Sequence, residues 1–126
     1  MGMELPSRRF ADTVVVGPAG RVDQGNAEDF KTALAPHLQT CAAGKDRVVI
    51  DLSRLEYISS AGLRVLMLAA KQAKAQGGAI VVSGLQPLVA EIFQISRFTM
   101  VFDIQPSLRD ALAKASPAAL TAFETA

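Results

Sequence analysis

The sequence contains few of the residues from which redox, metal and hydrolytic sites are built. Cys41 is the only cysteine, so the chain can form neither an internal disulfide nor a thiolate metal site. We therefore expect a reducing, cytoplasmic environment and a Cys41 thiol packed in the interior. His37 is the only histidine and is expected on a helix face. We predict no metal site and no bound cofactor.

Long apolar runs and an excess of one charge are also missing. No apolar stretch approaches the roughly 20 residues that span a membrane, so we predict no membrane span. The 13 basic and 12 acidic residues are interleaved and give a formal net charge of +1. Because binding to a phosphate backbone needs a basic patch, direct contact with nucleic acid is not expected.

Apolar residues make up half of the 126 positions, which is typical of a globular chain long enough for one compact domain. Runs rich in β-branched residues predict strands, and apolar residues at helical spacing predict helices. The expected strands cover residues 3–10, 13–16 with a bend before 21–23, 47–52, 79–83 and 102–104. The expected helices begin near Asn26, with a kink or division at Pro36, and near Ser60, Pro87 and Ser107.

This alternation of strands and helices predicts an α/β fold. The central sheet should be mixed but mostly parallel, with four to five strands and about four flanking helices. An antiparallel edge is expected if the first two strands form a hairpin. We predict a single domain over residues 1–126, with its core at about 3–115 and a frayed tail at 116–126.

Ser59 and Ser60 stand between a strand-like run and a helix-like run. Their simplest role is to cap the helix, because a serine oxygen accepts an otherwise unpaired backbone N–H. A nucleophilic serine is disfavoured, since His37 lies in another helix and Ile58 replaces the first glycine of GxSxG. The phosphate-binding patterns GxxxxGK[ST] and GxGxxG are absent. A phosphorylation acceptor remains a second hypothesis, because a helix N-terminus tolerates added negative charge.

The order of elements and the segment DLSRLEYISSAGLRVL resemble the STAS domain, specifically the bacterial anti-sigma-factor antagonists. The resemblance extends over about residues 3–115. It includes GRVD at 20–23, VVIDLS at 48–53, ISSAGL at 58–63 and GGAIVVSGL at 77–85.

The resemblance implies a regulatory binding protein, not an enzyme. In that family, the hydroxyl residue two positions before the glycine, here Ser60, is phosphorylated by an anti-sigma factor that is also a serine kinase. The unphosphorylated antagonist binds this partner and releases the sigma factor. The phosphorylated antagonist dissociates until a phosphatase of the PP2C type restores it.

Two positions differ from the family pattern. Ser59 replaces the usual acidic residue, and Ala61 replaces the hydroxyl residue that often follows the acceptor. Ser59 is thus a second, less favoured acceptor. The differences also motivate an alternative function, a STAS subunit of a signalling scaffold or transporter-associated complex that is not phosphorylated.

The predicted partner-binding residues surround the serines. They are Asp23, Ser59, Ser60, Ala61, Gly62 and Arg64. Asp23 has a turn-forming role as an equal alternative, and Arg64 is more simply a solvated helix residue. Val65, Leu68 and Ala69 form an apolar strip for which a covering helix is favoured over a docking partner.

Overall fold

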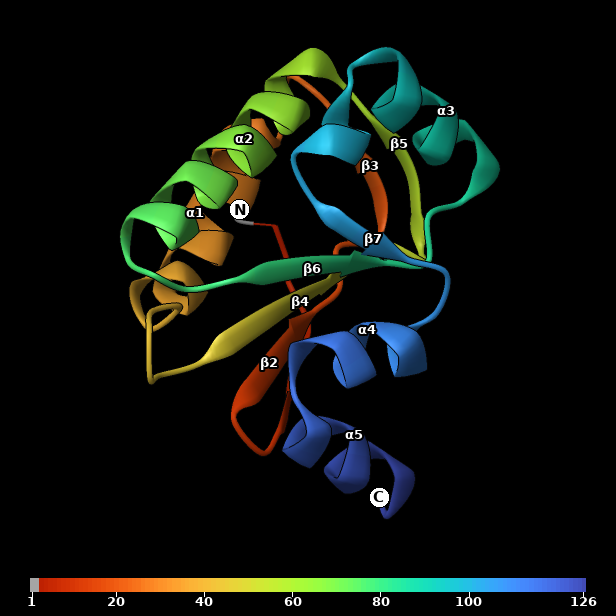
Figure 1. Cartoon of the computed structure of the whole chain (residues 1–126). Coiled ribbons are helices and arrows are strands. Elements are labelled where there is room, and N and C mark those ends of the chain that lie inside the picture. The colour runs from red at the N-terminus through yellow and green to blue at the C-terminus, as the bar shows by residue number, and fades with distance from the viewer. Residues whose placement is uncertain (1–2) are drawn as a thin grey trace.

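The structure, a computed structural model, describes residues 3–126, so the first two residues of the predicted domain lie outside it. Strands and helices alternate along most of the chain (Figure 1). The strands are β1 (Ser7–Phe10), β2 (Thr13–Val16), β3 (Gly20–Val22), β4 (Arg47–Asp51), β5 (Leu55–Ile58), β6 (Ile80–Ser83) and β7 (Asp103–Gln105). The helices are α1 (Ala27–Gln39), α2 (Ser60–Ala75), α3 (Pro87–Ile95), the 3-10 turn η1 (Phe98–Met100), α4 (Leu108–Ala115) and α5 (Pro117–Glu124).

Five strands form the central sheet in the order β1-β2-β4-β6-β7. The first two strands pair antiparallel, and the other three pairings are parallel. The predicted mixed, mostly parallel sheet with an antiparallel edge is therefore confirmed.

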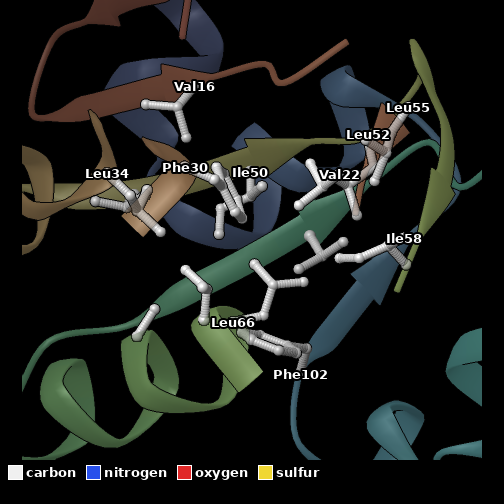
Figure 2. Packing of buried hydrophobic residues seen from close by; sticks show 14 of the residues in the cluster. Val16, Val22, Phe30, Leu34, Ile50, Leu52, Leu55, Ile58, Leu66 and Phe102 are labelled. Atoms are coloured by element: carbon white, nitrogen blue, oxygen red, sulfur yellow. The ribbon is translucent and has the colours of Figure 1, made fainter. Parts of the chain in front are cut away.

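Side chains of the central strands alternate between two apolar clusters, as the period of a strand requires. Val48 and Ile50 face the helices α1 and α2, whereas Val49 faces α4 and α5. Figure 2 shows Phe30, Ile50 and Leu66, from α1, β4 and α2, gathered in the larger cluster. Since both faces are covered, β4 reads in the sequence as a continuous apolar run.

The sequence analysis expected the segment after GPAG to continue β2 beyond a bend, and this prediction is wrong. Gly20 has a φ of +74°, and after it the chain leaves the central sheet and pairs in parallel with β5. The two strands β3 and β5 form a separate sheet, and β5 was not predicted as a strand distinct from 47–52. This small sheet determines where the serines lie.

The predicted frayed tail at 116–126 is wrong, because Pro117–Glu124 forms α5. Ser116 is buried and caps the helix, its hydroxyl oxygen accepting from the backbone nitrogen of Ala119 at 3.3 Å. The Phe123 ring packs edge-on against Phe10 of β1, with 5.4 Å between ring centroids. Ala119 and Phe123 thus place α5 in the same apolar cluster as Phe10 of β1.

Three further predictions concern the first helix and its exit. Pro36 does not divide α1, since it lies on the exposed side of the helix, where the carbonyl without a donor can meet water. His37 lies half-buried in the last turn. Cys41 is buried as predicted, and burial raises the pKa of its thiol.

Candidate functional site

The small sheet brings two strand-to-helix loops together. β3 and β5 run parallel with Val22 opposite Ile58, so the loop that enters α1 and the loop that enters α2 leave the same end of the sheet. The backbone nitrogen of Ser59 donates to the carbonyl of Val22 at 2.8 Å. Asp23, which follows Val22, is thereby held beside the serines, although 36 residues separate the two segments.

Ser59 is the N-cap of α2. Its backbone is extended, and its hydroxyl oxygen accepts a hydrogen bond from the backbone nitrogen of Gly62 at 3.3 Å. Its carbonyl also accepts from the nitrogen of Leu63 at 2.9 Å. The capping role proposed for the serine pair therefore falls on Ser59, whose half-buried side chain is engaged with its own helix.

Ser60 is the first residue of α2, and its side chain is exposed. The hydroxyl group accepts no capping hydrogen bond, because Ser59 occupies that role. The positive end of the helix dipole lies directly under it, where a negative group is stabilised. The two neighbouring serines thus differ: one is a structural cap, and the other is free to meet a partner or an enzyme.

Gly62, which the sequence analysis predicted as a partner-binding residue, is buried in the protein. A Cβ added there would lie 2.7 Å from Ile58 Cγ1 and 2.8 Å from Val22 Cγ1. Glycine is needed because the first turn of α2 packs directly on β3 and β5. Its part in the site is to position the two serines.

The loop after β3 is braced by side chains. One Asp23 carboxylate oxygen accepts from the backbone nitrogen of Gly25 at 2.9 Å, which makes the turn that was predicted as its alternative role. Asn26 occupies the N-cap position of α1, but its side chain points backward. It accepts from the nitrogen of Asp23 and donates to the carbonyl of Arg21, each at 2.8 Å.

A groove of about 480 Å³ separates the first turns of α1 and α2 and is open to solvent. It is lined by Gln24, Ala27, Glu28, Lys31, Ser59, Ser60, Ala61, Arg64, Val65 and Leu68. Ser60 and Arg64 are exposed on one wall, and Glu28 and Lys31 are exposed on the other. The groove therefore combines the candidate acceptor with charges of both signs.

The apolar strip predicted on α2 is divided by the fold. Val65 and Ala69 are buried in the core cluster that contains residues of α1, which bears out the covering helix. Leu68 remains 47% exposed and lines the groove. The apolar side chain of Leu68 is thus left at the rim, about two helical turns after Ser60.

Sequence reasoning missed the contribution of α1. Neither Glu28 nor Lys31 was among the predicted partner-binding residues. Periodicity shows that both lie outside the apolar stripe of α1, but it does not indicate which surface they share. The crossing of α1 and α2 decides that.

The residues that line the groove include no histidine. His37 lies in the last turn of α1, whereas the first turns of this helix line the groove. Across residues 3–126, no cluster of three or more histidine, cysteine or acidic side chains could hold a metal ion. None of the helices in this part of the chain is long and apolar enough to cross a bilayer.

Comparisons with known proteins agree on one family. The family model described as "Mlab, STAS domain" matches residues 8–106. A protein of Bordetella bronchiseptica assigned as the anti-sigma factor antagonist BtrV is 41% identical over 118 residues, which cover 94% of this chain and 98% of the relative.

Solved structures share the fold at lower identity. An anti-sigma-factor antagonist (STAS) domain protein from Planctomyces limnophilus is 19% identical with a TM-score of 0.80, covering 92% of this chain and 99% of its own. The Bacillus cell fate determinant SpoIIAA, in its phosphorylated form, is 16% identical with a TM-score of 0.65, covering 90% and 100%.

Proposed function

Since the chain belongs to the STAS domain family, and within it to the anti-sigma factor antagonists, we propose that it acts by partner switching controlled at Ser60. Unphosphorylated, it binds an anti-sigma factor that is also a serine kinase and so releases a sigma factor. Phosphorylated on Ser60, it dissociates, and a phosphatase of the PP2C type restores it. The cycle runs in the cytoplasm, where Cys41 stays reduced.

The observation that carries this proposal is the division of roles between the two serines. Ser59 is engaged as a cap, whereas Ser60 is exposed one residue later on the groove wall. A kinase can reach the Ser60 hydroxyl without unfolding the helix. A phosphate at this position adds about 1.5 to 2 negative charges at the helix end that favours them, so the fold should survive modification.

The same added charge should prevent docking. A partner seated over the groove would cover Ser60 together with Ala61, Arg64 and Leu68. Covering a phosphate dianion requires removing its water, and an unmatched charge in an interface costs several kcal/mol. Because each 1.4 kcal/mol changes the affinity about tenfold, phosphorylation should weaken partner binding by two or more orders of magnitude. Asp23, beside the serines, belongs to the same contact surface.

The test is phosphorylation by the cognate kinase. Protein incubated with the anti-sigma kinase and ATP should gain one phosphate, and Ser60→Ala should abolish the gain while Ser59→Ala retains it. Continued labelling of the Ser60→Ala variant would refute the assignment. Partner binding is measured in parallel, where Ser60→Asp should weaken the complex by about a hundredfold.

The alternative of a STAS subunit that is not phosphorylated gives the opposite result. In that case no phosphate is incorporated, and Ser60→Asp leaves partner binding nearly unchanged. Ser60→Asn is the matched control for the aspartate variant, because it changes the side chain without adding charge.

A further inference from the structure

A second groove of about 350 Å³ lies between α2, the beginning of β6 and the turn η1. Its floor is formed by apolar residues, among them Met67, Ala70, Ile80 and Phe102. Met100 and Val101 stand at its edge and are 84% and 38% exposed. This groove belongs to the latter half of α2, away from the serines (Figure 1).

The exposed residues of this groove are held on a rigid base. Phe98 and Phe102, on either side of them in the chain, are both buried. The Phe98 ring contacts Phe93 of α3 at 5.5 Å and Phe102 at 6.1 Å between centroids. Met100 and Val101 are therefore presented outward by an anchored turn, so that binding a partner would cost little ordering of the chain.

The charge around this groove has one sign. Lys71 and Lys74 line it, and α2 contains no acidic residue anywhere along its length. None of the four ion pairs among residues 3–126 involves either lysine. An apolar floor with a basic rim is complementary to a segment that has apolar residues on one side and carboxylates beside them.

We propose that this groove, which we name the α2–η1 groove, is a second docking surface and that it binds an acidic amphipathic helix of a partner protein. The apolar side chains of the helix, recurring at i, i+3, i+4 and i+7, enter between α2 and Met100. Its flanking Glu or Asp residues meet Lys71 and Lys74. Met100 adapts to the incoming side chains because methionine is flexible and polarizable.

Binding here is independent of the state of Ser60. Lys71 follows Ser60 by about three turns of α2, which is about 16 Å along the helix axis. At physiological salt, charges in solvent are screened over about 8 Å. A phosphate on Ser60 thus leaves the α2–η1 groove unaffected, and a partner bound there stays attached while the serine surface exchanges its own.

The test uses the full chain, labelled with ¹⁵N, and a synthetic peptide of about 15 residues with Leu at i, i+3, i+4 and i+7, Glu at the positions that flank them and Ala elsewhere to favour the helix. The peptide should shift the amide resonances of Lys71, Lys74, Ile80 and Val101. The Lys71→Glu/Lys74→Glu variant should bind about tenfold more weakly. Lys45→Glu, an exposed charge reversal outside the groove, and Ser60→Asp should bind like the unmodified protein.

Several results would overturn the proposal. One is that the amide resonances of the α2–η1 groove do not shift at about millimolar peptide. Another is that Lys45→Glu weakens binding as much as the Lys71→Glu/Lys74→Glu variant does. A third is that a peptide with Lys in place of Glu binds as tightly as the Glu peptide. Shifts of the same resonances on raising the protein concentration without peptide would show that a second copy occupies the groove instead. Weakening by Ser60→Asp would contradict independence from the serine site, whereas failure of Ser60 phosphorylation would affect only the proposed function.

Discussion

Substitutions of the two serines at the start of α2 should have different effects: Ser59→Ala should lower stability, and Ser60→Ala should abolish phosphorylation. Ser59→Ala removes the hydroxyl that accepts from the nitrogen of Gly62. Loss of an N-cap costs about 0.5 to 2 kcal/mol. The separation of 3.3 Å between the Gly62 nitrogen and the Ser59 oxygen is longer than the usual value of about 2.9 Å, so we expect the lower part of that range, about 0.5 to 1 kcal/mol. The melting temperature should fall by about 2–5 °C.

Ser60→Ala should leave stability within about 0.5 kcal/mol of the original, because the side chain is exposed and makes no capping bond. Both variants are measured by urea denaturation and by phosphate incorporation with the kinase. Ser59→Asn is the control, since asparagine caps as well as serine and should restore stability.

Two results would refute this reasoning. If Ser60→Ala lowered the free energy of unfolding as much as Ser59→Ala, the cap would be assigned to the wrong residue. If Ser59→Ala lost the phosphate while Ser60→Ala kept it, the acceptor would be wrong.

Other perturbations test the surroundings of the site and the frame of the fold. Gly62→Ala should destabilise the protein by about 1–3 kcal/mol in a denaturant titration, because the new methyl group overlaps two buried side chains of β3 and β5; unchanged stability would contradict the close packing. Asp46 receives two hydrogen bonds from Arg9, at 2.9 and 2.8 Å, which lower the pKa of its carboxyl group below the ordinary 3.8. This stabilisation is present above about pH 4 and is lost as the pH falls through the lowered pKa. Arg9→Gln should therefore reduce the fall in unfolding free energy at acid pH by up to about 1 kcal/mol, and the same pH dependence in both proteins would contradict this ion pair. Phe123→Ala should melt several degrees lower, because the ring contact with Phe10 is lost. An unaltered melting temperature would indicate that the tail is frayed, as the sequence analysis predicted.

The roles of the two serines could be predicted only in part from the local sequence. A serine before an apolar helical stripe is enough to predict a strand-to-helix junction with a cap. The sequence did not decide which hydroxyl makes the cap, because a shift of the helix start by one residue exchanges the two roles. The bond from Gly62 to Ser59 settles it.

The C-terminal segment shows the opposite limit. SPAALTAFETA contains a proline that should stop the preceding helix, and Leu120 and Phe123 are its only large apolar residues, so its local pattern predicts fraying. Its helix persists because Ala119 and Phe123 pack on a hairpin more than 100 residues earlier in the chain. Contact over such a separation has no signature in the segment itself.

The sequence by itself determined most of the alternation of strands and helices, the burial of β4 on both faces and the place of Ser60 at the start of a helix. These features follow from periodicity and capping, which act over a few neighbouring residues. Only the tertiary structure decided that β3 leaves the central sheet to pair with β5, that Asp23 comes beside Ser59, and that Met100 stands next to the lysines of α2. These placements depend on strand pairing and helix crossing between distant segments, whose energies no short stretch of the chain contains.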